Sequence, residues 1–388
     1  MNRRRTFIGG AAIAASSTVL TSVIVHADEA AAHRPPSGVL PSAHDITDVL
    51  HRVADHWIGA RPDPGDNKWA NATFFSGLMA LHALTYDPRY LRYARGWAEK
   101  HHYGLNAGSV TRHADNQCAG QAYLDLHALD PDEEKIAAIE SCLRWMTYDD
   151  RPGKDDDWWW VDALHMAMPT FARLSVLRED PRYAEKLYRL YQHTKRTEGG
   201  PGLYDRSTGL WYRDRRFLPG HRLSLSGVPV FWSRGNGWAA AGHVKTLKAL
   251  PPDAPHTGEY RDTLALLLQT VAQRQRADGF WDVNLGDPER LSGPESSGTA
   301  LFVYALAYAL RTGLVDRATY LPVAARAWNG LVGTAVRQDG FLGYVPGVGD
   351  RPESSAPVTE GSAAGFGVGA FLLAGTELAA LARGVTVR

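Results

Sequence analysis

The chain has 388 residues, 44% of them hydrophobic and 22% charged, which is enough to bury one large core and excludes a largely disordered protein. Its 42 basic residues balance 42 acidic ones, and beyond residue 27 the balance is 39 to 42. The chain is therefore nearly neutral and has no excess of positive charge that would attract nucleic acid or an anionic membrane. We expect neither as a partner.

Residues 1–27 have the composition of an export signal. They carry three arginines at the start, an apolar middle and a small-residue end at Ala27. The RRTF motif at residues 4–7 fits the twin-arginine pattern, which implies export in the folded state. A membrane anchor is the alternative, but the apolar part is short and interrupted by Gly, Ser and Thr. We therefore expect a secreted protein, with a leader at 28–42 and one catalytic domain at 43–388.

Helix-start signals recur along the chain. DPRY occurs at residues 87–90 and 180–183, and DPDEE at 130–134 resembles it. Asp can cap a helix, and Pro can occupy the first helical position because its missing N–H costs nothing there. An amphipathic segment follows each signal, and a more uniformly apolar segment precedes it. This alternation predicts inner helices that are buried all round and outer helices with one wet face.

The helix count favours a closed ring. Inner helices are expected at residues 74–85, 118–129, 160–177, 235–250, 296–310 and 367–382, and two further outer helices at 260–275 and 318–336. With the helices after the three signals, the outer set lacks one member, which residues 43–60 can supply by packing against the last inner helix. Stacked units end in an open solenoid or a ring, and this closure predicts an all-α (α/α)6 barrel. The strand signals are sparse, although residues 209–217 can form one arm of a short hairpin.

The loops that enter the inner helices share an unusual composition. They carry acids, amides, arginine and at least seven aromatic residues, and they meet at one rim because every inner helix runs in the same direction. Polar groups that bind hydroxyls and aromatic faces that cover C–H patches are typical of a carbohydrate site. In any one loop, the polar residues could equally well cap the helix that follows, and the aromatic residues could cover its buried end. The six loops together favour a sugar site.

Three polar residues in these loops are candidates for chemistry. Asp162 follows three tryptophans and an expected helix cap at 155–157, and partial burial among indoles would raise its pKa, as suits a general acid. Asp115 would face the same rim, although helix capping is an equally good role for it. Arg234, flanked by tryptophans, suits a substrate carboxylate because its planar fork matches that group.

No residue pattern indicates a metal or a cofactor. The cysteines, Cys118 and Cys142, lie outside any CxxC or Cys/His cluster, and His101, His102 and His113 are isolated. The two cysteines are either buried thiols or one disulfide formed after export.

Six long motifs resemble family 105 of the glycoside hydrolases, the unsaturated rhamnogalacturonyl and glucuronyl hydrolases. The motifs are HADNQCAGQAYLDL, DDWWWVDALHMAMP, VFWSRGNGWAAAG, ADGFWDVNL, ESSGTALFVYAL and VGAFLLAGTELA, in the family's order. The resemblance implies an (α/α)6 barrel without a cofactor. It also implies an oligosaccharide substrate, left by a polysaccharide lyase, that ends in a 4,5-unsaturated uronic acid.

The resemblance also implies a mechanism and its residues. An acid protonates C4, water adds at C5, and the hemiketal opens and expels the aglycone, so the two-carboxylate spacing rule of ordinary glycosidases need not apply. By motif match, Asp162 is the acid and then the base, and Asp115 is the supporting carboxylate. The implied substrate contacts are Trp160, Arg234 and Trp238.

One loop departs from the family. Some members carry a His-Gly-Trp turn where this chain reads LWYRDRRF at residues 210–217. Arg213 can replace that histidine, and we count Trp211 and Trp232 as further substrate contacts. The departure leaves the choice between galacturonyl and glucuronyl ends open, together with the aglycone and the oligomeric state. An inverting glycosidase that uses Asp115 and Asp162 on saturated sugars, or a non-catalytic sugar-binding protein, are the alternatives.

Overall fold

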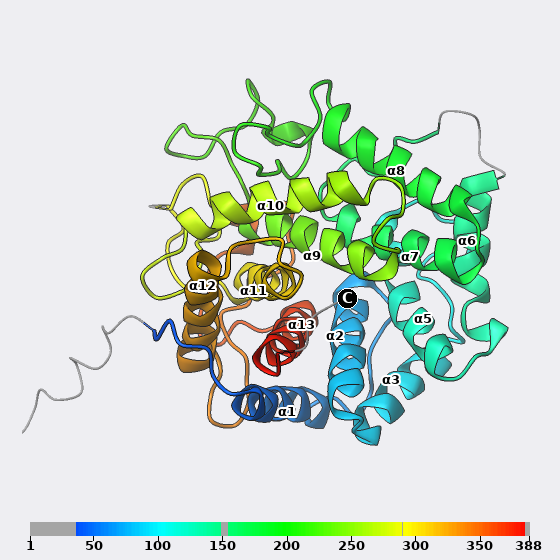
Figure 1. Cartoon of the computed structure of the whole chain (residues 1–388), viewed down its shortest axis with the longest axis horizontal. Helices are drawn as coiled ribbons and strands as arrows, with labels where there is room; N and C mark the ends of the chain where they lie inside the picture. The colour runs from blue at the N-terminus through cyan, green and yellow to red at the C-terminus, as the bar shows by residue number, and fades with distance from the viewer. Residues whose placement is uncertain (1–35, 149–153, 289, 385–388) are drawn as a thin grey trace, which may run out of the picture. The chain divides into compact units, whose positions relative to one another are not determined.

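The computed structural model describes residues 36–148, 154–288 and 290–384, and the regular structure in these ranges is helical (Figure 1). All of them belong to a contact unit that begins at Pro35. The predicted export signal at 1–27 and the leader up to residue 35 lie outside the described residues.

Six helices form an inner ring. They are α2 (Trp69–Thr85), α5 (Ala119–Leu129), α7 (Ala163–Leu177), α9 (Ser233–Ala249), α11 (Ser296–Arg311) and α13 (Gly365–Ala382). Each contacts the next in this order, and α13 contacts α2, so the ring closes. The six predicted inner helices are therefore present, with ends shifted by a few residues.

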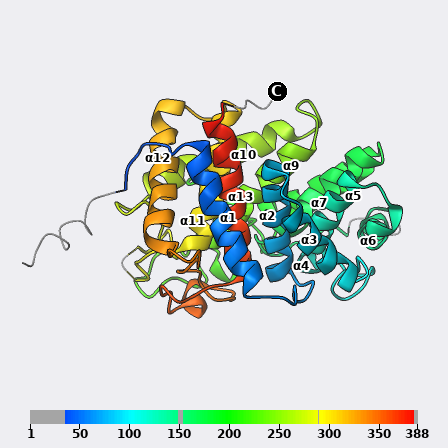
Figure 2. The same cartoon turned by 90° about the horizontal axis from the view of Figure 1, so that it is seen from below.

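Six further helices surround the ring. They are α1 (Ala43–Gly59), α3 (Pro88–Lys100), α6 (Ala137–Tyr148), α8 (Pro181–Arg196), α10 (Thr257–Gln273) and α12 (Arg317–Gly330). α1 packs against α13, the last inner helix, as Figure 2 shows with α1 in blue beside α13 in red. The predicted (α/α)6 barrel and its closure by the first helix are confirmed.

Short helical turns occupy the loops between these helices. They are α4 (Ala114–Gln117), η1 (Glu133–Lys135), η2 (Arg215–Phe217), the π-helical η3 (Leu331–Ala335) and η4 (Pro352–Ser355).

The inner helices approach one another closely where both carry glycine. A Cβ atom on Gly77 of α2 would lie 2.3 Å from the carbonyl oxygen of Gly369 on α13. A Cβ on Gly369 would in turn lie 2.3 Å from the carbonyl oxygen of Thr73. Side chains cannot occupy these positions, so the two glycines allow the backbones of α2 and α13 to meet and seal the ring.

α13 is the most apolar part of the ring. Among the described residues it is the helix long and apolar enough to cross a membrane by length and composition, but 78% of that window is buried inside the protein. A helix surrounded by other helices needs no polar face, which explains the composition.

Two of the three helix-start signals act as predicted. Asp87 accepts a hydrogen bond from the Arg89 N–H at the start of α3, and Asp180 accepts one from the Arg182 N–H at the start of α8. The third signal differs, because Asp132 caps the short turn η1 and α6 begins only at Ala137.

The segment 209–217 forms isolated antiparallel bridges. Trp211 pairs with Tyr204 across a tight turn, and Asp214 pairs with Trp160 at the entrance of α7. The hairpin suggested by the sequence is therefore very short, and its outgoing arm ties the loop before α9 to the loop before α7.

Cys118 and Cys142 are buried free thiols, so the disulfide alternative is wrong. Burial raises the pKa of Cys118 to about 12 and that of Cys142 to about 11. Both thiols stay protonated at neutral pH and are therefore poor nucleophiles.

Candidate active site

Asp162 lies at the rim where the inner helices begin. It occupies the N-cap position of α7 but makes no side-chain cap bond, and its Oδ2 is buried without a hydrogen-bond partner among the described residues. The residue is 8% exposed. The expected cap at 155–157 is wrong, because Asp155 pairs with Lys186 and Asp157 with Arg112. The carboxylate at this helix entrance is therefore not used in capping and is available to a substrate.

Arg213 supplies the positive charge beside Asp162. Its Nε lies 3.3 Å from Asp162 Oδ2, an ion pair without hydrogen-bond geometry, and its Nη1 donates to Asp214 Oδ2 at 2.8 Å. Burial works to lower the pKa of Arg213, but the two carboxylates outweigh it and raise that pKa. The Val161 N–H donates to the Arg213 carbonyl at 2.9 Å, so backbone pairing fixes the arginine next to Asp162.

Asp115, in the short helix α4, is the second carboxyl group of the site. Burial, and then the negative charge of Asp162, raise the pKa of Asp115 to about 7, against the opposing effect of Arg213. The site therefore holds a carboxyl group that exchanges a proton near neutral pH, next to a carboxylate paired with arginine. Two carboxyl groups in such different environments are the usual basis of acid–base chemistry.

Two aromatic rings line the approach to these carboxyl groups. Trp160 is buried, and its ring lies 4.6 Å from that of Trp159 and 4.5 Å from that of His113. Trp159 is 38% exposed, and the Arg213 guanidinium lies 5.8 Å from its ring. The pair of indoles gives the site an apolar wall next to its charges, as a pyranose ring requires.

Arg234 is 1% exposed and is held from three sides. Its Nη1 and Nη2 donate to the carbonyl oxygens of Pro346 and Gly347 at 3.3 and 3.1 Å, and its guanidinium lies 4.3 Å from the Trp232 ring and 4.8 Å from the Phe366 ring. Burial lowers the pKa of Arg234 to about 10. Arg234 therefore anchors the 346–347 loop, and only its Nε is left without a partner in the described structure.

Residues 44–382 match the family model described as Glycosyl Hydrolase Family 88. The chain belongs to this family. It is 30% identical over 337 residues to the unsaturated 3S-rhamnoglycuronyl hydrolase of Formosa agariphila, covering 80% of this chain and 84% of that protein. The predicted resemblance to unsaturated uronyl hydrolases is confirmed, and the enzyme is a glycoside hydrolase.

Solved structures agree on the fold. A family 88 glycosyl hydrolase from Bacteroides vulgatus superimposes with a TM-score of 0.82 at 33% identity, covering 88% of this chain and 100% of that one. A protein described as a polysaccharide lyase gives 0.82 at 34% identity, covering 89% and 99%. A family 105 hydrolase from C. acetobutylicum shares the fold at a TM-score of 0.68 and 20% identity, covering 86% and 98%.

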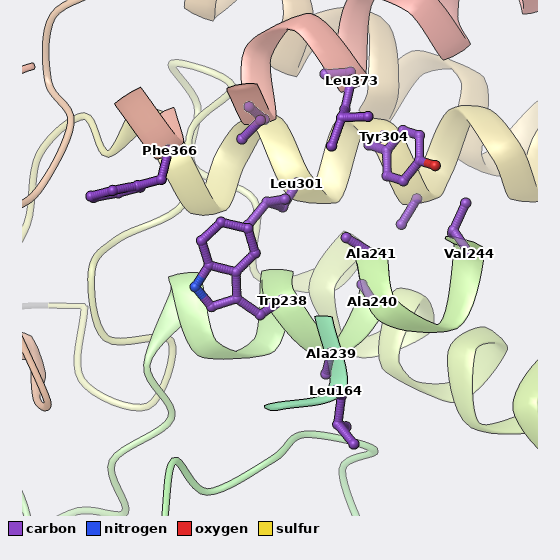
Figure 3. Packing of buried hydrophobic residues seen from close by; sticks show 14 of the residues in the cluster. Leu164, Trp238, Ala239, Ala240, Ala241, Val244, Leu301, Tyr304, Phe366 and Leu373 are labelled. Carbon is purple, nitrogen blue, oxygen red and sulfur yellow. The ribbon is translucent and has the colours of Figure 1, made fainter. Parts of the chain in front are cut away.

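The other side chains of this family 88 enzyme that were predicted to contact the substrate lie in different surroundings. Trp238 is buried inside the ring, where its ring lies 4.6 Å from that of His165 and where Figure 3 shows it beside Leu301. Trp232 lies under the Arg234 guanidinium. Trp211 is 0% exposed and packs on Tyr204, behind the wall formed by the site tryptophans.

Three residues near the site were not among the predicted site residues. His113 lies with its Nδ1 3.8 Å from Asp115 Oδ2, and burial, then Arg213, lower the pKa of its imidazole. Trp159 and Glu295 are the other two. Two of the three had a signal in the sequence, since His113 opens the HADN motif and Trp159 is the middle member of the tryptophan triplet. In the described part of the chain, no group of three His, Cys, Asp or Glu side chains is placed to hold a metal.

Glu295 is a buried cap that links two inner helices. Its carboxylate accepts from the N–H groups of Ser297 and Gly298 at 2.7 Å each, at the start of α11, and from Ser233 Oγ at 3.0 Å, at the start of α9. Its charge also attracts Arg234. Glu295 therefore helps to hold Arg234 in the position from which it contacts the 346–347 loop.

We expect Glu295→Ala to lower the free energy of unfolding by about 2–4 kcal/mol. The substitution leaves four buried donors without an acceptor, the Ser297 hydroxyl being the fourth, and removes a negative charge near a buried guanidinium. Urea unfolding followed by circular dichroism measures the change. Glu134→Ala, at an exposed position, is the control and should stay within about 0.5 kcal/mol of the wild type. A Glu295→Ala protein as stable as this control would show that the cap is dispensable.

Proposed function

We propose that this family 88 enzyme removes a 4,5-unsaturated uronic acid from the non-reducing end of an oligosaccharide by hydrating the C4=C5 double bond. The observation that carries the proposal is the pairing of Asp162 with Arg213, next to the proton-binding Asp115. The name of the Formosa agariphila relative, at 30% identity, supports the same substrate class.

Hydration needs one proton delivered to C4 and one removed from the water that attacks C5. The Asp162 carboxylate is not used to cap α7, so it is suited to give the first proton and to take up the second. Arg213 balances the negative charge on Asp162 whenever the proton is absent. The hydrated product is a hemiketal, which opens to a keto acid and releases the aglycone with its hydroxyl group restored.

The apolar wall and the charges suit a flat, unsaturated uronyl ring. Trp159 presents an exposed indole face that packs against the buried Trp160, and Arg213 and His113 place polar groups beside the two rings. Arg213 stands in the loop that departs from the family 105 pattern, and we propose that it contacts the substrate there. Because the relative is named an unsaturated 3S-rhamnoglycuronyl hydrolase, rhamnose is the first aglycone to test.

The test uses unsaturated uronyl disaccharides made with a polysaccharide lyase. The purified enzyme should abolish the ultraviolet absorbance of the C4=C5 bond and release the aglycone in equal amount. Galacturonyl and glucuronyl ends should be tried separately. Persistent absorbance with both epimers and several aglycones would overturn the proposal.

A polysaccharide lyase is the second candidate, favoured by the 34% identical structure described in those words. Elimination by a lyase creates the C4=C5 bond, so absorbance would rise with intact polysaccharide, whereas a hydrolase lowers it with the oligosaccharide. An inverting glycosidase would release saturated sugars without a change in absorbance. A non-catalytic binding protein would do neither. Absorbance measured on both substrates, together with an assay for released saturated sugar, therefore separates the alternatives.

A further inference from the structure

A second cavity lies at the end of the barrel opposite Asp162. It has a volume of about 380 Å³ and takes lining residues from all six inner helices. Most of these residues come from the middle and later turns of the helices, with Gln121 in the first turn of α5, whereas Asp162, Asp115 and Arg213 stand at the rim where the helices begin. Figure 3 shows two of the lining residues, Tyr304 and Leu373, among the buried side chains of the inner helices.

Two of the three cationic side chains of this cavity already have carboxylate partners. Arg173 Nη1 donates to Asp125 Oδ1 at 2.5 Å. Lys248 Nζ donates to Glu377 Oε2 at 2.7 Å. Glu377 also pairs with Arg311, so its single negative charge is shared between two cations.

Lys245 is the third cation, and its hydrogen-bond partners are neutral. Its ammonium donates to Ser76 Oγ and to Gln121 Oε1, the latter at 2.7 Å, and no carboxylate among the described residues makes a hydrogen bond to it. Burial lowers the pKa of Lys245 to about 8, although the charge of Asp125 opposes this. An ammonium group has three N–H donors, so one donor remains for a ligand.

A favourable interaction with a helix dipole does not explain the position of the Lys245 ammonium. Cations stabilise helix C-termini when they approach the last carbonyl groups. The ammonium of Lys245 instead binds two side chains, one in the middle of α2 and one in the first turn of α5, and neither position is a helix C-terminus. A partly desolvated cation without a counter-ion is costly, and an incoming anion would offset that cost.

The rest of the lining is largely apolar. It includes Met79, Leu129, Pro169 and Leu373, and the ring of Tyr304. We propose that this cavity binds a small organic monocarboxylate, with the carboxylate on Lys245 and an apolar body against Met79 and Leu373. The third N–H donor of Lys245 suits one carboxylate, and the apolar lining would leave a second negative charge unpaired, which favours a monocarboxylate over a phosphate or a dicarboxylate.

Isothermal titration calorimetry of the full chain with hexanoate tests the proposal directly. We expect a Kd on the order of 1 mM, as a ligand of this size with one charged contact permits. Hexanamide, which has the same shape without the charge, should bind at least about tenfold more weakly, because the ion pair contributes on the order of 1.4 kcal/mol. No activity is measured, so the outcome does not depend on the proposed reaction.

Two variants locate the binding. Lys245→Met should weaken hexanoate binding at least about tenfold, whereas Lys100→Met, at a lysine outside the cavity, should leave it unchanged. Ala80→Phe keeps the lysine but fills the cavity, and should also abolish binding. Circular dichroism verifies that each variant is folded. Equal binding of the amide, unchanged binding in Lys245→Met, or no binding by the wild type would each overturn the proposal.

Discussion

Asp162→Asn should lower kcat for an unsaturated uronyl disaccharide by about 10³-fold and change KM little. The amide keeps the shape of the side chain but cannot give a proton to C4 or take one from water, and positioned acid–base groups contribute about 10²–10⁴-fold. The rate is read from the loss of double-bond absorbance, with aglycone release as the second signal.

The matched control for this variant is Asp156→Asn in the same loop. Asp156 is exposed and pairs with Lys154, so its substitution should leave kcat within about twofold of the wild type. Near-ultraviolet circular dichroism on both variants verifies that the tryptophan wall is intact. A folded Asp162→Asn enzyme that retains more than about a tenth of the wild-type rate would remove Asp162 from the proton transfer.

Asp115→Asn should stabilise the protein at neutral pH while reducing its activity. The pKa of Asp115 is about 7 in the folded protein and near 4 in the unfolded chain. Between these values the folded state binds more protons than the unfolded state, so this carboxyl group lowers the free energy of unfolding as the pH rises from about 4 to about 7.

The expected gain from Asp115→Asn at pH 8 is about 1–3 kcal/mol. Three pKa units set an upper limit of about 4 kcal/mol, and solvent screening reduces it because the side chain is 26% exposed. The gain should fall below about 0.5 kcal/mol at pH 4, where the carboxyl group is protonated in the folded state and about half protonated in the unfolded chain. Urea unfolding between pH 4 and 8, with Asp156→Asn as the control, measures this. A gain that is the same at every pH would mean that the charge of Asp115 is not its cause.

Much of the barrel follows from local chemistry that can be read along the chain. Asp87 and Asp180 start helices because a capping carboxylate and a following proline act within one turn. The apolar character of α13 marks it as an inner helix, because burial on every side leaves no need for polar residues. The helix count then requires α1 to close the ring. The position of Asp162 at the rim follows from the direction of the inner helices.

The environment of the site depends on how the loops cross that rim. Arg213 reaches Asp162 because the backbone of Val161 pairs with that of Arg213, a contact between distant segments that no local periodicity encodes. The same loop geometry packs the Trp211 ring against that of Tyr204.

The raised pKa of Asp115 likewise needs the folded protein, since it arises from burial and from the charge of Asp162 on another helix. Residue types and helix starts are thus set by neighbours within a turn or two. Charge pairing and desolvation are set by groups that meet only when the ring closes, and they can be assigned only from the tertiary structure.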